Sequence, residues 1–127
     1  TGRTTRMLEL ALADGFRASI DSGLPVLIMC ATYRECERIG HLFLSMAAAR
    51  GFVIYCPART IVALTAPGLP GGILNARYRF MSFADTFAHL VIGRDWAEVY
   101  IDHYAHEYAV RKRARDVLNT VDRRKHI

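Results

Sequence analysis

The first part of the chain alternates between amphipathic and wholly apolar segments. Residues 4–22 have apolar side chains at the three- and four-residue spacing of one helix face, and Gly23 stands where that helix would end. Residues 25–31 form a continuous apolar run, which is typical of a strand buried on both faces in a parallel sheet. The pattern therefore predicts a helix followed by a buried strand.

A second helix and a second strand follow. Thr32 and Glu35 have the spacing of a capping box, which places a helix start at the end of the preceding strand. We expect this helix to continue to about Arg50, before Gly51, because its apolar residues form one stripe. The apolar segment 52–56 is the next predicted strand.

The second half of the chain has a less regular pattern. Three further strands are predicted, over residues 60–65, 77–83 and 97–102. A short helical segment is expected over 85–90, and a final helix over about 105–119.

Strands that alternate with helices predict an α/β fold. The apolar runs favour a three-layer arrangement, with a mostly parallel sheet and helices on both faces. Strands 25–31, 52–56 and 97–102 are expected at the centre of this sheet. A length of 127 residues suits a single domain, 1–127, with a hydrophobic core of its own.

Composition indicates what class of protein this is, but it says little about what the protein does. No apolar stretch approaches the roughly 20 residues of a membrane-spanning helix, and no signal-peptide pattern is present. Three cysteines without a C-x-x-C pair are expected to be reduced. We therefore expect a cytoplasmic protein without a membrane partner. The net charge of +5 suits an acidic partner such as nucleic acid or the phosphates of a nucleotide.

The first residues contain the most specific motif. Gly2, Arg3, Thr4 and Thr5 match the second half of a Walker A motif, with Arg3 in place of Lys, where the first helix begins. In that motif the N–H groups of the helix start hold phosphates, the basic side chain reaches them, and a hydroxyl, here that of Thr4, holds Mg²⁺. The alternative is that Thr4 or Thr5 caps the helix and Gly2 is a flexible end.

The strand 97–102 ends in Asp102, and an acid at this place resembles the Walker B acid that orients Mg²⁺. With Gly2–Thr5 and the order of elements, it makes the chain similar to P-loop NTPases of the RecA and helicase-like class, and to small phage-encoded P-loop-like proteins. The resemblance implies a nucleotide-binding domain for ATP or another NTP with Mg²⁺, held through Thr4 and Asp102. The strand before the P-loop is absent from these residues, so such a domain would lack its first strand.

Two departures from that family concern hydrolysis. Arg3 replaces the P-loop Lys, and His103 stands where helicase-like members have the Glu that polarises water. Glu107 is the remaining acid that could take over this role beside Asp102, about one helical turn away. We therefore expect at most a weak NTPase.

Two further sets of residues are candidates for nucleic-acid contact. The resemblance places Thr32 and Arg34 where helicases have a Thr and an Arg near the nucleic-acid groove. Arg111 and Arg113 belong to a basic run on the last predicted helix, which suits a nucleic acid or, alternatively, a solvated helix face. His103 and His106 have the spacing of a metal-binding pair, but the sequence offers no identifiable third ligand.

Three functions remain open from the sequence. The first is a degenerate P-loop domain that binds NTP and acts in nucleic-acid processing. The second is a non-enzymatic, phage-type interaction protein that binds a host protein in the host cytoplasm. The third is a basic nucleic-acid-binding module that uses its arginine surface.

Overall fold

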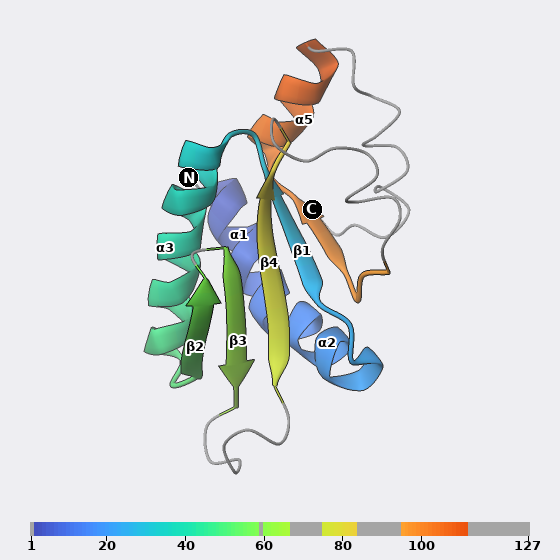
Figure 1. Ribbon diagram of the computed structural model, residues 1–127. Helices are drawn as coiled ribbons and strands as arrows, with labels where there is room; N and C mark the ends of the chain where they lie inside the picture. Colours follow the sequence, from blue (N-terminus) through green and yellow to red (C-terminus); the bar gives the residue numbers. More distant parts are fainter. Residues whose placement is uncertain (1, 59, 67–74, 84–94, 112–127) are drawn as a thin grey trace.

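The computed structural model describes residues 2–58, 60–66, 75–83 and 95–111, with side chains in the last segment as far as Glu107. A five-stranded sheet forms its centre, and α1 lies behind the strands in the view of Figure 1. The helical elements are α1 (Gly2–Leu10), the π-helical η1 (Ala11–Gly15), α2 (Phe16–Ser22), α3 (Tyr33–Ala49) and α5 (His103–Arg111). The strands are β1 (Val26–Cys30), β2 (Val53–Ala58), β3 (Ile61–Thr65), β4 (Ala76–Ser82) and β5 (Val99–Ile101).

The prediction of a three-layer, mostly parallel sheet is wrong. The strand order is β2-β3-β4-β1-β5, in which β4, β1 and β5 are parallel while β2 pairs with β3, and β3 with β4, in antiparallel fashion. Of the three strands expected at the centre, β1 is interior, whereas β2 and β5 are the outer strands of the described sheet. Only two residues separate β2 from β3, and a parallel connection needs about a dozen or more.

The long helices lie on the same face of the sheet. Residues of α1, such as Leu8, and of α3, such as Phe43, share one buried cluster with Ile28 of β1 and Tyr78 of β4. The ring centroids of Phe43 and Tyr78 are 4.7 Å apart, and those of Phe43 and Phe80 are 5.3 Å apart. This cluster is the main core of the described residues.

A smaller cluster lies on the opposite face of β1 and β5. It joins Leu27, Met29, Val99 and Ile101 to Phe83, Trp96 and Ala105. Within the described segments, α5 contacts this cluster through Ala105, while α1 and α3 pack on the other face. Helices were expected on both faces of the sheet, but among the described elements the second face has only the contact with α5.

The helix predicted over 4–22 is present, but its middle turn is a π-helix. The hydroxyl of Tyr78 donates a 2.7 Å hydrogen bond to the Ala11 carbonyl, and that of Tyr100 reaches the Leu10 carbonyl at 3.4 Å. A π turn disturbs the regular i→i−4 pairing, and these two hydroxyls satisfy carbonyls next to the disturbance. Gly23 ends the helix with φ +73°, the left-handed conformation expected of a C-terminal glycine.

The helix predicted after Thr32 is confirmed. The Thr32 hydroxyl accepts a 3.2 Å hydrogen bond from the Glu35 N–H, and the helix ends at Ala49 before Gly51. The last helix begins at His103, two residues earlier than expected, and its predicted end lies outside the described residues, as does the segment 85–90. Among the described helices, none has the length and apolarity that crossing a membrane requires.

Candidate functional site

The candidate site lies at the carboxyl edge of the three parallel strands. Because β4, β1 and β5 run in the same direction, the residues that follow them meet at this edge. Asp102 directly follows β5, and Thr32 follows β1 after one intervening residue. The first turn of α1 lies at the same edge, because Thr4 contacts Asp102.

Thr4 and Asp102 form a buried hydrogen-bonded pair. The Thr4 Oγ1 hydroxyl donates to Asp102 Oδ1 at 2.8 Å, and each residue is 1% exposed. Asp102 Oδ2 accepts the backbone N–H of Tyr104 at 3.3 Å, so the carboxylate also caps α5. The sequence predicted that the G-R-T-T segment and Asp102 lie at one edge of the sheet, and Thr4 and Asp102 are in contact there. Their roles in binding nucleotide and Mg²⁺ remain a prediction.

His103 borders the Asp102 carboxylate. Its Nδ1 lies 3.7 Å from Asp102 Oδ1, and its ring centroid is 4.0 Å from that of Tyr104. The Nδ1 atom is buried and has no hydrogen-bond partner among the described residues. The carboxylate therefore accepts hydrogen bonds from one hydroxyl and one backbone N–H, and the imidazole nitrogen lies beyond hydrogen-bond distance. In the described segments, neither Lys nor Arg forms an ion pair with it within 4.0 Å.

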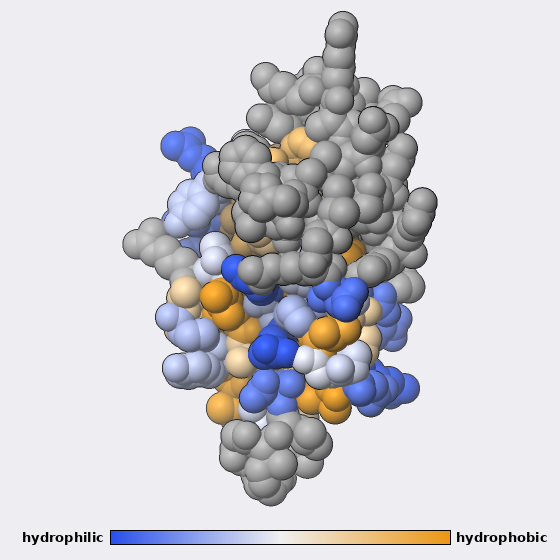
Figure 2. Space-filling view, turned by 45° about the vertical axis from the view of Figure 1, so that its right-hand side comes forward, coloured by the Kyte–Doolittle hydropathy of each residue, from blue (hydrophilic) through white to orange (hydrophobic). Residues whose placement is uncertain are grey.

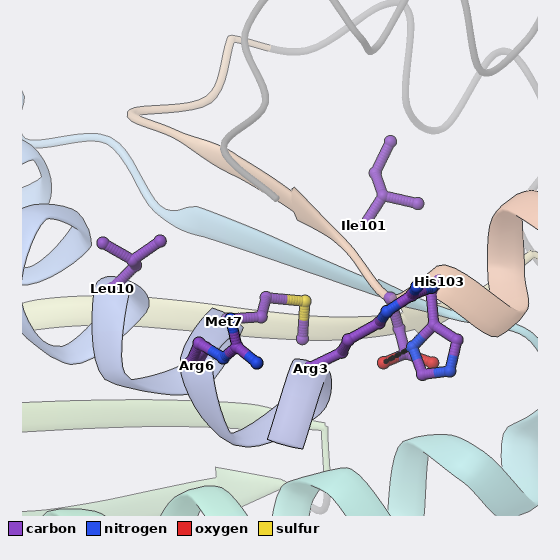
Figure 3. Close-up of a pocket in the computed structure, with 7 residues that line it drawn as sticks. Arg3, Arg6, Met7, Leu10, Ile101 and His103 are labelled. Carbon is purple, nitrogen blue, oxygen red and sulfur yellow. Dashed lines mark ion pairs between the residues drawn. The ribbon is translucent and has the colours of Figure 1, made fainter. Parts of the chain in front are cut away.

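A cavity of about 340 Å³ opens beside this pair. Figure 3 shows that the Arg3 side chain extends from the first turn of α1 towards the start of α5, where His103 lies. The cavity is lined by Arg3, Arg6, Met7, Leu10, Ile101, Asp102 and His103. Arg3 and Arg6 come from successive turns of α1 and are both exposed, so the mouth of the cavity is positively charged.

An ion pair between Glu35 and Arg38 lies on the first turns of α3, near the same edge. Arg38 Nε and Nη2 donate to the two carboxylate oxygens of Glu35 at 2.8 and 2.9 Å. Arg38 lowers the pKa of Glu35 through these hydrogen bonds and its charge, and His103 contributes a weaker electrostatic effect in the same direction. Arg38 also interacts electrostatically with Asp102. Sequence reasoning missed this pair, although its i,i+3 spacing on a helix starting at this edge was a usable signal.

The other predicted residues divide into three groups. Gly2 is exposed at the start of α1, and Thr5 is half-buried in its first turn. Thr32 caps α3 with its hydroxyl, and Arg34 is exposed on the first turn of that helix. Glu107 is exposed on α5, one turn beyond His103.

The last predicted residues are the arginines and the histidine pair of the final helix. The side chain of Arg111 and the whole of Arg113 lie outside the described residues. No group of three or more His, Cys, Asp or Glu residues in the described segments is arranged to hold a metal ion, so His103 and His106 have no third protein ligand there. Arg6, Met7 and Leu10 line the cavity but were not predicted; Arg6 follows Arg3 at helical spacing, which was the available signal.

The donor set is compatible with a magnesium ion bound together with phosphate. Mg²⁺ prefers oxygen ligands and is often held by one or two protein oxygens while substrate phosphates and water complete its coordination. Thr4 and Asp102 offer a hydroxyl and a carboxylate, and Arg3 and Arg6 offer donors for phosphate oxygens. No family model, curated protein or solved structure matches this chain.

Proposed function

We propose that this edge of the sheet binds the phosphates of a nucleoside triphosphate with Mg²⁺, and that the domain acts in nucleic-acid processing with weak or no hydrolysis. The observation that supports it best is the 2.8 Å hydrogen bond between Thr4 Oγ1 and Asp102 Oδ1. The residues that would hold the ion are Thr4 and Asp102, and the ion would neutralise phosphate charge when bound.

The arginines of α1 support phosphate binding at this edge. Arg3 and Arg6 line the cavity beside Asp102, and a guanidinium can donate two hydrogen bonds to one phosphate. The N–H groups of the first turn of α1 add positive partial charge at the same place. Arg3 is bulkier and more rigid than the lysine of a Walker A motif, so it would neutralise phosphate without reproducing the lysine geometry.

The surroundings of Asp102 support weak hydrolysis. A catalytic base must accept a proton or hydrogen bond from the attacking water, and a carboxylate performs this role in many NTPases. Within the described part of the cavity wall, Asp102 is the single carboxylate, and it is already bonded to Thr4 and Tyr104. His103 carries no negative charge, and Glu107 is exposed rather than part of the cavity wall.

Binding is tested by thermal shift and calorimetry with ATP and GTP, each with Mg²⁺ or with EDTA. We expect Mg²⁺-dependent stabilisation, which reaches about 2.7 kcal/mol when the ligand is at 100 times its Kd. Thr4→Val and Arg3→Gln should reduce it. The matched controls are Ser19→Ala, which removes a buried hydroxyl bonded to Leu24 and Arg77, and Arg17→Gln, which removes an exposed arginine of α2.

Loss of binding in Thr4→Val but not in Ser19→Ala would support the site, because both variants lose a buried polar contact. Equal loss in both would indicate a general effect on stability and would contradict the proposal. Absence of binding by the unmodified protein would favour a non-enzymatic interaction protein, in which Thr4 and Asp102 act only to join α1 to α5.

Hydrolysis is tested by steady-state phosphate release, with and without single-stranded DNA. We expect turnover well below the 1–10 s⁻¹ that is typical of working enzymes. Turnover in that range, abolished by Asp102→Ala but retained by Ser19→Ala, would show that the expectation of weak hydrolysis is wrong.

A further inference from the structure

No described helix covers the sheet face opposite α1 and α3 over β2, β3 and β4. Val53 and Tyr55 of β2 point to this face and are 62% and 66% exposed, although both are large apolar or aromatic residues. Figure 2 shows strongly hydrophilic side chains directly beside hydrophobic ones between the two grey regions. Val53 and Tyr55 are neighbours on one face of the same strand, and adjoining exposed apolar side chains can mark a binding surface.

Two cross-strand rows bring aromatic, apolar and cationic side chains together on this face. Tyr55 pairs with Ala63, which pairs with Arg77 in the next strand. Arg79, two residues further along β4, pairs with Ile61 on one side and is in register with Leu27 on the other. Residues in register point to the same face, so Tyr55 lies two strand spacings, about 10 Å, from Arg77.

The two arginines have unused hydrogen-bonding capacity. Arg77 is exposed, and its Nη2 donates to the Gly23 carbonyl, which leaves further donors on the same guanidinium. The Nε of Arg79 is buried and has no hydrogen-bond partner among the described residues. Arg79 is half-buried and lines the same recess as Arg77, so a second guanidinium is available to an anion bound there.

A surface recess lies at the arginines. Its volume is about 540 Å³, and it is lined by Leu24, Pro25, Ile61, Arg77, Arg79 and Asp95. Asp95 is exposed and supplies one carboxylate against the two arginines of this lining. The described lining therefore has more positive than negative side chains beside the apolar Leu24, Pro25 and Ile61, which suits an anionic ligand with apolar parts.

We propose that this face binds single-stranded nucleic acid, with phosphates on Arg77 and Arg79 and a base stacked on Tyr55. Single strands expose both the backbone charge and the faces of their bases, and proteins bind them with cationic grooves and aromatic side chains. An acidic peptide would use the arginines but would leave Tyr55 without a stacking partner. The face lies away from Thr4 and Asp102, so this inference does not rest on the proposed nucleotide site.

The test measures binding of fluorescein-labelled 20-nucleotide dT and U strands by fluorescence anisotropy at several salt concentrations. We expect Tyr55→Leu to weaken binding about 5- to 100-fold, through loss of base stacking. Arg77→Gln and Arg79→Gln should each weaken binding about 5- to 10-fold at 50 mM salt and reduce the slope of log K against log[salt] by about 0.7. Arg17→Gln, the matched control on α2, should leave binding unchanged.

Photo-crosslinking of a 5-iodouracil strand, followed by mass spectrometry, should identify the peptide that contains Tyr55. The proposal is overturned if the strands do not bind, or if Arg17→Gln weakens binding as much as Arg77→Gln and Arg79→Gln do. It is also overturned if a labelled oligoglutamate peptide or a 20-base-pair duplex binds as tightly and Tyr55→Leu has no effect. Circular dichroism melts of each variant separate a lost contact from a lost fold.

Discussion

The Thr4 hydroxyl donates a 2.8 Å hydrogen bond to the carboxylate of Asp102, which lies 98 residues further along the chain. Both side chains are 1% exposed. The bond joins the first turn of α1 to the residue that caps α5, so it stabilises the carboxyl edge whether or not a ligand is present there.

We expect Thr4→Val to lower the free energy of unfolding by about 1.5–3 kcal/mol, because a buried carboxylate loses a hydrogen-bond donor. Asp102→Ala should cost about 1 kcal/mol more, through loss of the cap of α5. Urea denaturation measures both values, with Thr4→Ser as the control that keeps the hydroxyl. A change below 0.5 kcal/mol for Thr4→Val would mean that water or another group replaces the bond.

A methyl group at Gly15 should destabilise the protein although Gly15 lies in a helix. Its Cβ would come within 3.2 Å of Tyr100 Cε2 and 3.4 Å of Tyr100 Oη, and Tyr100 is fully buried. At Gly40 in α3 the same addition meets nothing within 4 Å, so Gly40→Ala should stabilise by about 0.5–1 kcal/mol. Paired thermal melts test this contrast, and a stabilising Gly15→Ala would contradict it.

Stability should fall at alkaline pH because of Tyr78 and Tyr100. Burial raises the pKa of both phenols, most strongly that of Tyr78. A group whose pKa is raised by folding stabilises the folded state below its unfolded pKa of about 10, and this contribution is lost as the pH rises further. Above pH 10, each of the two tyrosines should lower the free energy of unfolding by up to about 1.4 kcal/mol per pH unit.

Tyr78→Phe isolates one of these two tyrosines. We expect it to cost about 1 kcal/mol at pH 7, because the Ala11 carbonyl loses the Tyr78 hydroxyl, and to make stability decline less steeply above pH 10. Urea denaturation between pH 7 and pH 11 measures both effects. An unchanged slope would show that Tyr78 does not ionise during alkaline unfolding.

The three cysteines should react with thiol reagents at very different rates. Cys56 is exposed on β2, whereas Cys30 and Cys36 are buried. A hydrogen bond with Cys36 and burial raise the pKa of the Cys30 thiol, which lowers its thiolate fraction. When dithionitrobenzoate is added, the native protein should therefore react quickly at one thiol and at two more after unfolding, as measured by the thionitrobenzoate released. Cys56→Ser should abolish the fast phase.

The sequence predicted the elements far better than their pairing. Helical periodicity and apolar runs are local signals, so the predicted order of helices and strands agrees with the structure over the residues that the structure describes. The direction of a strand depends on its partner, and the apolar run 52–56 resembled a central strand although Val53 and Tyr55 are exposed on an edge. The predicted strands 52–56 and 60–65 are separated by only three residues, and this short connection was the overlooked signal, since it is too short for a parallel crossover and favours a hairpin.

The sequence predicted part of the candidate site, again because local motifs are visible in it while packing is not. A motif at a helix start and an acid at a strand end are both visible in the sequence, and the parallel strands bring Thr4 and Asp102 to one edge. The electrostatic interaction of Arg38 with Asp102 depends on how α3 packs on β1 and β4, which no local pattern specifies. The same holds for the two tyrosine hydroxyls that meet Leu10 and Ala11 across the core.

The wide turn at Ala11–Gly15 gives the first helix a tolerance for changes in chain length. A π turn holds more residues than an α turn, so the loss of exposed Ala13 can be absorbed by reverting this turn to ordinary α geometry. Thr4 at one end and Gly23 at the other would then keep their places. A deletion within residues 5–10 has no such reserve and would rotate Thr4 away from Asp102 by about 100°.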